Sequence, residues 1–375
     1  MFSYWEKKEL FERYQFAVIG GGIVGLSTAI YLAKAFPAKR ILVLERDAFS
    51  RGASSKNAGF SCFGSPSELL DDLKTLSSDE VFSLVERRYK GLMNLRSLLG
   101  NDRIGYDDCG GFELFTQAEQ PLFEECESGL AFLNNAIGNI GIPTPYEVVD
   151  LASKSWPFGG VKNAIGQMSE GAIQTGRMLL SLQELARQHG VLVLNGVNVS
   201  GWKETGKGVI LTIQQEDFLF EKAVVCTNGF AKDLLPELDV RPARNQVIVT
   251  EKIEALSLRG TFHMNKGYIY FREVDQRILL GGFRDVDVQN EFTDQLGLTE
   301  TIQEALTAFL HDVLYPERAL KIEYAWSGIM GLGPNKTTIV KQHSDHLFVG
   351  VRMGGMGVAI GSLVGKELAE LVLKS

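Results

Sequence analysis

A glycine-rich turn, GGGIVG at 20–25, constrains the fold of this chain more than any other segment. It follows the apolar run FAVI at 16–19, and behind it apolar residues recur at helical spacing until Pro37 ends the pattern. The next segment, ILVLE at 41–45, has the continuous apolar character of a strand that is buried on both faces. Strand, turn, helix and strand within about 30 residues form a βαβ unit, the building block of a parallel sheet.

The glycines of this turn fit the pattern G-x-G-x-x-G, which binds the pyrophosphate of a dinucleotide. Gly20 allows a tight turn, Gly22 lets the backbone approach the pyrophosphate, and Gly25 lets helix and strand pack closely. Glu45 ends the second strand, where an acid can accept both hydroxyls of a ribose. The predicted dinucleotide contacts of this unit are Gly20, Gly22, Ile23, Val24, Gly25, Glu45 and Arg46. The alternative is a purely structural turn with Glu45 as a surface charge.

Composition narrows the function classes. The chain has 375 residues, of which 45% are hydrophobic, so it can bury a large core and is long enough for two domains. Its net charge of −8 and the lack of a basic run argue against nucleic acid and anionic membranes as partners. No apolar run approaches the about 18 residues of a membrane span, and the first residues do not read as a secretory signal. Four scattered cysteines without a CxxC pair indicate neither a metal site nor a redox dithiol, so we expect reduced core residues in a cytoplasmic protein.

The α/β pattern returns in the second half of the chain. A helix is predicted at 175–189, and the strand VLVL follows it at 191–194. The strand AVVC at 223–226 leads into the turn TNG, and LFVG at 347–350 leads into a glycine-rich turn and a final helix. Because inserts separate these pieces, we expect two interleaved domains. The dinucleotide-binding domain is expected to gather 1–75, 150–240 and 325–375, and the substrate domain 76–149 and 241–324.

Four segments resemble the D-amino-acid oxidase superfamily of FAD-dependent oxidoreductases, the branch that contains glycine oxidase, sarcosine oxidase and gamma-glutamylputrescine oxidase. They are GASSKNAGF at 52–60, GAIQTGRMLLSLQELARQHGV at 171–191, AVVCTNGF at 223–230 and GGMGVAIGSLVG at 354–365. The resemblance implies an α/β fold in which a Rossmann-type FAD-binding domain, similar to that of glutathione reductase, is interleaved with an α+β substrate domain. The further FAD contacts that it implies are Ala53, Ser54, Ser55, Asn57, Ala58, Gly59, Phe60, Val199, Thr227, Asn228, Gly229, Gly355, Met356, Gly357 and Val358.

The resemblance also implies how FAD is held. The last segment places a helix N-terminus, at Met356, Gly357 and Val358, under the flavin, where N–H groups stabilise the negative charge of the reduced ring. An ordinary helix N-terminus packed on a sheet is the alternative. Some relatives link FAD to a His of the second-strand loop, or to a Cys just after the strand that here reads YAWSGIMG at 324–331. Lys56 occupies the first position and no Cys lies at the second, so we expect non-covalent FAD.

Substrate contacts are predicted from the same relatives. Glycine oxidase holds its substrate carboxylate with an Arg in the segment aligned with WSGIMG, and here that position is Met330. Tyr268, Tyr270 and Arg272 lie two residues apart and so share one face of a predicted strand. In relatives a Tyr from this strand lines the substrate cavity. The alternative is an aromatic strand face that packs in the core. The candidate anion partners are Arg272, Arg284 and Arg352, each with a structural or surface ion pair as its alternative role. The predicted catalytic residues are Tyr268, Tyr270, Arg272 and Arg352.

The activity implied by the resemblance is oxidation of a C–N bond in a small amine or N-substituted amino acid, by hydride transfer to flavin N5. The Lys that helps sarcosine oxidase react with O₂ is replaced here by Leu279. The expected electron acceptor is therefore O₂ or another molecule. One alternative is a flavin dehydrogenase that acts on a 2-hydroxy acid, and another is a flavin-binding protein without turnover.

Overall fold

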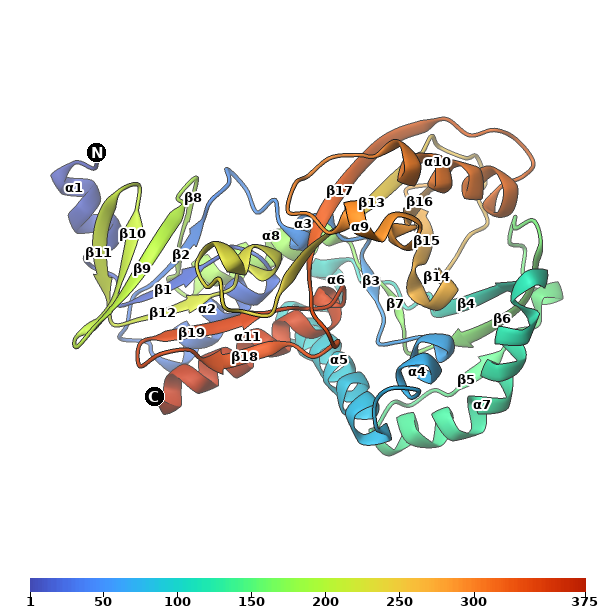
Figure 1. The fold of residues 1–375 in the computed structure, drawn as a ribbon, viewed down its shortest axis with the longest axis horizontal. Coiled ribbons are helices and arrows are strands. Elements are labelled where there is room, and N and C mark those ends of the chain that lie inside the picture. Colours follow the sequence, from blue (N-terminus) through green and yellow to red (C-terminus); the bar gives the residue numbers. More distant parts are fainter.

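A six-stranded sheet forms the centre of the lobe that carries both chain ends, on the left of Figure 1. The computed structural model describes residues 1–375. The strand order is β18-β19-β12-β1-β2-β8, and all neighbours are parallel except β18 at one edge. The strands span Phe16–Ile19 (β1), Ile41–Glu45 (β2), Leu192–Asn195 (β8), Lys222–Val225 (β12), Ile339–Gln342 (β18) and Leu347–Val351 (β19).

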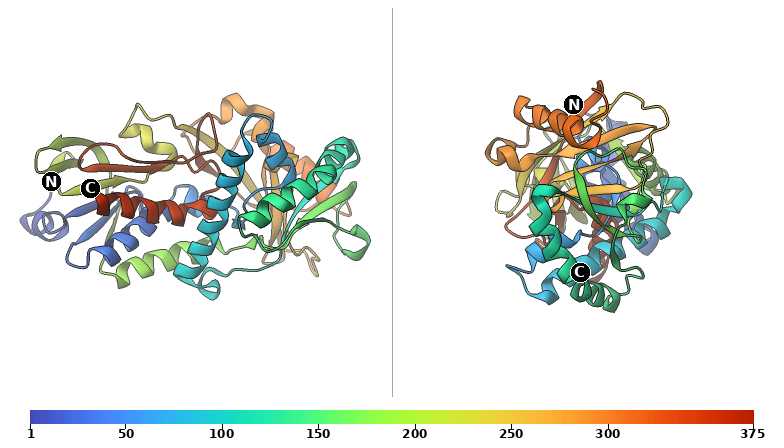
Figure 2. Two further views of the ribbon diagram at one scale, coloured as in Figure 1. Left: turned by 90° about the horizontal axis from the view of Figure 1, so that it is seen from below. Right: turned by 90° about the vertical axis from the view of Figure 1, so that its right-hand side faces the viewer.

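Both faces of this sheet are covered, which explains why its central strands are apolar throughout. Val18 of β1 belongs to a core that includes four long helices of this lobe, whereas Ala17 and Ile19 belong to a core shared with a smaller antiparallel sheet. The helices are α2 (Ile23–Ala35), α5 (Ser78–Leu99), α8 (Thr175–Gln188) and α11 (Gly357–Lys374). The smaller sheet consists of β9 (Val199–Thr205), β10 (Gly208–Ile213) and β11 (Glu216–Phe220). Figure 2 shows the whole molecule from two further sides.

An eight-stranded sheet forms the second lobe, on the right of Figure 1. Its order is β17-β13-β16-β15-β14-β4-β6-β5, and it is mixed because β4 and β14 run parallel while the other neighbours are antiparallel. The strands span Gly111–Thr116 (β4), Tyr146–Val148 (β5), Val161–Gln167 (β6), Arg241–Thr250 (β13), Thr261–Met264 (β14), Ile269–Val274 (β15), Arg277–Gly282 (β16) and Ile322–Leu332 (β17). The helices α7 (Gln120–Asn139) and α10 (Glu300–Phe309) pack against it.

Short elements surround the region where the two lobes meet. They are α3 (Ala53–Lys56), β3 (Phe60–Ser61), α4 (Pro66–Asp72), β7 (Gly171–Ala172), η4 (Asn228–Asp233), η5 (Asn265–Gly267), η6 (Arg284–Asp287) and α9 (Val288–Glu291). The remaining short helices are α1 (Tyr4–Glu6), η1 (Lys7–Phe11), α6 (Asn101–Ile104), η2 (Gln117–Glu119), η3 (Leu151–Ser153) and η7 (Leu310–Leu314).

Three segments lie in a different lobe from the one that the sequence division proposed. β6 and the whole of β17 belong to the eight-stranded sheet, although 150–240 and 325–375 were assigned to the FAD-binding domain. Helix α5 packs against α11 and α8 of the first lobe, although the sequence places 76–149 in the substrate domain. The physical reason is pairing: β17 is paired with β13 along its length, so its second half cannot leave the second sheet.

The predicted α/β fold, in which a Rossmann-type domain with a parallel sheet is interleaved with an α+β second domain, is confirmed. The four cysteines are free and buried, as their scattered positions indicated. In agreement with the hydropathy of the sequence, none of the helices combines the length and apolar character needed to cross a bilayer.

Candidate functional site

A cavity of about 880 Å³ lies where the two lobes meet. Ile19 and Leu44 line it from the six-stranded sheet, and Val247, Tyr270 and Gly328 line it from the eight-stranded sheet. This volume is near the upper end of the roughly 300–1,000 Å³ typical of ligand pockets, which suits a large ligand. The cavity therefore joins the predicted dinucleotide site to the predicted substrate site.

Most of the predicted FAD contacts line this cavity. The exceptions are Gly25, Ser55 and Gly59, which act on the shape of the loops instead. A Cβ at Gly25 would lie 1.9 Å from the Gly20 carbonyl oxygen, so glycine is required for the tight turn before α2. A Cβ at Gly59, where φ is +76°, would lie 2.3 Å from the carbonyl oxygen of Ile173.

The turn before α2 presents open donors to the cavity. The backbone N–H groups of Gly22 and Val24 have no acceptor within the chain, and both residues line the cavity. The N–H of Ile23 is already used, because it donates to Ser54 Oγ at 2.9 Å. Free N–H groups at a helix N-terminus bind phosphate, so the fold offers a pyrophosphate site here.

Glu45 is buried at the end of β2 and also lines the cavity. Its Oε2 accepts the N–H of Gly21 at 2.9 Å, and its Oε1 accepts the N–H of Asp47 at 3.1 Å. Each carboxylate oxygen keeps a second lone pair, so the side chain can fix the turn and still accept ribose hydroxyls. Arg46 stacks on the ring of Phe230 at 3.9 Å and lines the same region.

The loop between β2 and β3 is held in place by one amide side chain. Asn57 Oδ1 accepts the N–H of Gly59 and the hydroxyl of Thr175, both at 2.9 Å, which ties the loop to α8. Its Nδ2 donates to the carbonyl oxygen of Ser54 at 2.8 Å. Asn57 therefore shapes the wall beside the cavity as well as lining it.

A second set of open donors lies at the N-terminus of α11. The N–H of Met356 donates to the Met353 carbonyl oxygen at 3.0 Å, but those of Gly357 and Val358 have no acceptor within the chain. Asn228 Oδ1 accepts the N–H groups of Arg352 and Met353, which couples the turn 227–229 to this helix. Of the three donors expected here, two are free to meet an anionic ligand group.

Two buried polar atoms in the cavity wall, Thr227 Oγ1 and Asn245 Oδ1, lack a partner. Thr227 Oγ1 makes no hydrogen bond within the chain, although buried hydroxyl groups are normally satisfied. Together with the open N–H groups and the glycine turn, this unsatisfied atom fits a bound dinucleotide.

The wall formed by the second sheet is neutral and largely aromatic. Tyr270 accepts a hydrogen bond from Asn245 Nδ2 at 3.0 Å, and burial raises the pKa of Tyr270 well above its usual range. His263 lies opposite Tyr270 on the neighbouring strand, and burial lowers the pKa of His263 to about 4. The ring of Phe60 packs edge-on against both, at 5.6 Å from Tyr270 and 5.0 Å from His263.

An acidic helix, α4, contributes the charged part of the wall. Glu68 pairs with Lys336 at 2.8 Å and with Arg88 at 3.2 Å, and Asp71 pairs with Lys266 at 2.6 Å. Burial would raise the pKa of Glu68, but Arg88 and Lys336 outweigh it and hold this pKa at about 2. No local pattern in the sequence predicts this cluster, or the roles of His263 and Asn245, because the partners of these residues are distant along the chain.

The arginines predicted at the active site are placed differently from the tyrosines. Tyr268 and Tyr270 line the cavity, whereas Arg272 and Arg352 do not. Arg272 is buried and donates to the Ile173 carbonyl oxygen at 3.1 Å. Arg352 donates to the Thr337 carbonyl oxygen at 2.8 Å through Nε, and to other groups of the same loop. Both guanidinium groups are used to join loops, so neither is available to a substrate.

Two thiols line the cavity, and both are poor nucleophiles. Burial raises the pKa of Cys226 to about 12, and burial also raises the pKa of Cys62 well above its usual range. Because the thiolate is the reactive form, neither side chain is prepared to attack a flavin. This agrees with a non-covalent cofactor.

Sequence relatives of this chain are oxidoreductases. A family model described as FAD dependent oxidoreductase (DAO) matches residues 15–371. Glycine oxidase of Geobacillus kaustophilus is 23% identical over 371 residues, which cover 96% of this chain and 93% of that protein. The probable oxidoreductase OrdL of Haemophilus influenzae is 21% identical over 374 residues, which cover 96% of this chain and 83% of that protein.

Solved structures share the fold over nearly the whole chain. Glycine oxidase from Geobacillus kaustophilus has a TM-score of 0.76 at 20% identity, covering 97% of this chain and 95% of that chain. L-proline dehydrogenase from P. horikoshii has a TM-score of 0.78 at 16% identity, covering 97% and 94% of the two chains. Since the family model matches almost the full length and the cavity fits a dinucleotide, the chain belongs to the DAO family of FAD dependent oxidoreductases and is an enzyme that binds FAD non-covalently.

Proposed function

We propose that this enzyme oxidises a C–N bond of a small amine or N-substituted amino acid. The observation that carries the proposal is the neutral wall formed by Tyr270, His263 and Asn245. Bound FAD would accept the hydride from the carbon next to nitrogen. Glycine oxidase and L-proline dehydrogenase, whose folds are similar, carry amine substrates in their names.

The protonation state of the wall favours an amine over a 2-hydroxy acid. An alcohol must lose its hydroxyl proton as hydride leaves, and a general base with a pKa near the working pH does this best. His263, with a pKa of about 4, is a weak base, and Tyr270 stays protonated. A neutral amine needs no such base, because its lone pair supports the positive charge that develops on carbon. The wall then has only to exclude water and hold the amine in place.

The position of Met330 agrees with a cavity that lacks the usual carboxylate-binding Arg at this point. Met330 lines the cavity from β17, and its sulfur would lie 3.6 Å from a Cβ placed on Gly355. The side chain therefore lies over the glycine turn before α11 and adds apolar surface there. A small amino acid cannot be held by its carboxylate at this position.

We propose that the reduced flavin passes its electrons either to O₂, as in an oxidase, or to a different acceptor, as in a dehydrogenase. Leu279 does not line the cavity but packs in an apolar cluster with Ala58, Val247 and Val249. Leu279 therefore supplies no cation at the sequence position that corresponds to the oxygen-activating Lys of sarcosine oxidase. Comparing the rate of flavin reoxidation by air with that by artificial acceptors would distinguish the two.

The test is anaerobic flavin reduction by a panel of substrates, followed through the loss of the visible flavin band. The panel contains glycine, sarcosine, D-alanine, L-proline, polyamine derivatives and lactate. We expect at least one amine, and not lactate, to reduce the flavin. Reduction by lactate alone would favour the 2-hydroxy acid dehydrogenase, and no reduction by any compound would favour a flavin-binding protein without turnover.

A further inference from the structure

The cations of the cavity differ in whether the protein neutralises them. The cationic side chains that line the cavity are Arg46, Lys56, Lys266, Arg284 and Lys336. Lys266 and Lys336 are paired with carboxylates of α4, and Arg46 lies 3.6 Å from Asp233. Lys56 and Arg284 make no ion pair. Lys56 belongs to the loop 52–60, which forms the FAD side of the cavity, so Arg284 is the one unpaired cation that lines the cavity from the second lobe.

Arg284 is half-buried and unusually free of polar partners. Its guanidinium group makes no hydrogen bond or ion pair within the chain, and it lies 5.6 Å from the ring centroid of Tyr268 and 5.9 Å from that of Phe292. The two rings orient the guanidinium group through cation–π attraction, and its N–H donors remain free for a ligand. A planar array of open donors matches a carboxylate in geometry and charge.

The backbone next to Arg284 is fixed to Tyr268, the residue that directly precedes β15. Phe283 adopts a left-handed conformation with φ +59°, and its N–H donates to the carbonyl oxygen of Tyr268 at 3.0 Å. Asp285 Oδ2 accepts a hydrogen bond from Asn265 Nδ2 at 2.9 Å. Arg284 is thus held between two anchored neighbours.

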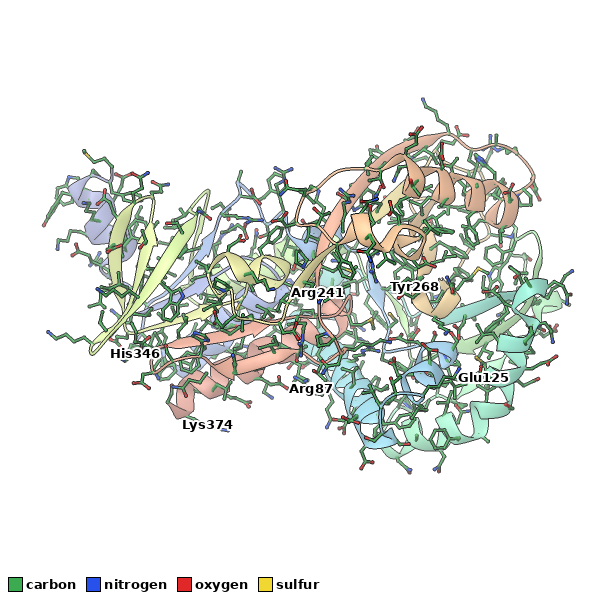
Figure 3. All side chains as sticks on the ribbon, viewed as in Figure 1. Arg87, Glu125, Arg241, Tyr268, His346 and Lys374 are labelled. Atoms are coloured by element: carbon green, nitrogen blue, oxygen red, sulfur yellow. The ribbon has the colours of Figure 1, made fainter.

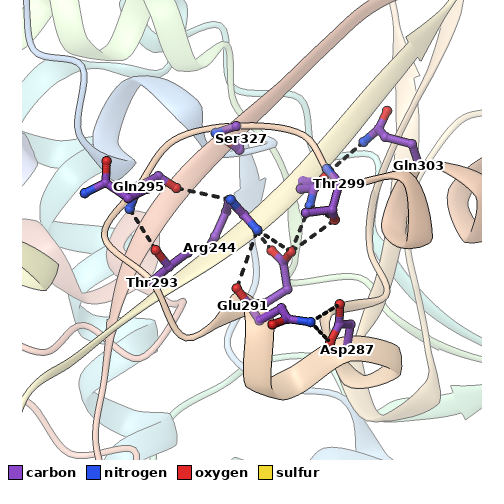
Figure 4. A network of polar contacts seen from close by, with 11 residues as sticks. Arg244, Asp287, Glu291, Thr293, Gln295, Thr299, Gln303 and Ser327 are labelled. Carbon is purple, nitrogen blue, oxygen red and sulfur yellow. Dashed lines mark hydrogen bonds and ion pairs between the residues drawn. The ribbon is translucent and has the colours of Figure 1, made fainter.

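A buried polar network fixes the far end of the same segment, as Figure 4 shows. Glu291 accepts Arg244 Nη2 at 2.8 Å and Arg244 Nε at 3.0 Å, and Gln246 Nε2 donates to the same carboxylate at 3.0 Å. Since Arg244 and Gln246 lie on β13, the network binds α9 to the eight-stranded sheet. The segment between β16 and α10 therefore presents Arg284 from a rigid support.

The surroundings of Arg284 place it near the opening of the cavity. Tyr268, labelled in Figure 3, and Phe292 are each 38% exposed, whereas Tyr270 belongs to the enclosed neutral wall. We propose that Arg284 binds a carboxylate of the substrate near this opening while the reacting amine lies further in, by Tyr270. This proposal rests on the proposed amine oxidation. The substrate is then an amine that also carries an acid group. Arg284 of η6 binds this acid group, whereas glycine oxidase uses an Arg at the position that Met330 of β17 occupies here.

The test measures binding of inert acids and their uncharged amides to the oxidised holoenzyme, through the change that they cause in the visible flavin spectrum. The probes are benzoate with benzamide, and hexanoate with hexanamide. We expect at least one acid to bind about tenfold or more tightly than its amide, as a charge-assisted hydrogen bond implies. Arg284→Gln should abolish this preference, and Arg284→Lys should keep part of it.

The matched control is Arg259→Gln, because Arg259 is exposed, pairs with Asp107 and lies outside the cavity. It should leave the preference for acids unchanged. Retained FAD absorbance shows that each variant is folded. The proposal is overturned if neither acid binds more tightly than its amide, or if Arg284→Gln keeps the preference. The proposed function is judged separately by the amine panel, since inert acids do not report on oxidation.

Discussion

Gly22→Ala combined with Ser54→Ala isolates the contact between the glycine turn and the pyrophosphate. Gly22 has φ −84° and ψ −170°, which alanine adopts without strain. Its new Cβ would lie 2.7 Å from Ser54 Oγ, and no other side chain except the Cβ of Ser54, at 3.5 Å, comes close. Ser54→Ala removes that hydroxyl, so the double variant contains no clash within the protein.

The double variant should therefore bind FAD more weakly while the stability of its fold stays nearly unchanged. Displaced phosphates would lose the open N–H groups of Gly22 and Val24, and a hydrogen bond to a charged group contributes about 1.5–3 kcal/mol. Losing both raises the dissociation constant by about 10²–10⁴-fold. Ser54→Ala alone loses one neutral hydrogen bond, from the N–H of Ile23, and should weaken binding by less than about tenfold.

The assay is FAD titration of the apoproteins, followed by flavin fluorescence, with circular dichroism as the check on folding. Gly25→Ala provides a contrast, because its Cβ would meet the Gly20 carbonyl oxygen at 1.9 Å and the backbone itself would have to move. That variant should misfold, whereas the double variant should fold and bind poorly. If the folded double variant binds FAD as tightly as Ser54→Ala, the turn does not contact the pyrophosphate and the reasoning is refuted.

Four further outcomes are expected. Acid denaturation should release all flavin from the chain, and flavin that stays with the precipitate would contradict non-covalent binding. Glu45→Ala should weaken FAD binding by about 1–3 kcal/mol, as measured by the same titration. Glu291→Gln leaves Arg244 buried without its counter-charge and should cost about 3–5 kcal/mol, seen as a lower thermal midpoint. Burial raises the pKa of Glu170 from an ordinary value of 4.5 to about 8. Between these two pH values the folded chain keeps a proton that the unfolded chain releases. The resulting contribution to stability is full below pH 4.5 and is lost as pH rises to about 8. Urea midpoints should therefore fall across this range, and Glu170→Gln should make the fall smaller.

Local patterns predicted the first lobe well. The run FAVI became β1, ILVLE became β2, and the glycines between them took up the tight turn with Gly20 at φ +105°. Such a unit is specified by neighbours in sequence, because hydrophobic period and glycine spacing act within a few residues. The boundaries between lobes were less accurate, since the sheet that β17 joins depends on its partner β13, far away in the chain.

The sequence by itself determined the α/β class, the glycine turn and the segments that line the cavity, because each depends on residues that are close together in the chain. Only the tertiary structure decided which of the candidate arginines is available to a substrate. Arg272 and Arg352 are used by backbone carbonyl oxygens of distant loops, and Arg284 faces the cavity without such a partner. The physical reason is that the role of a charged side chain depends on the groups that surround it, and these groups are brought together only when the chain folds.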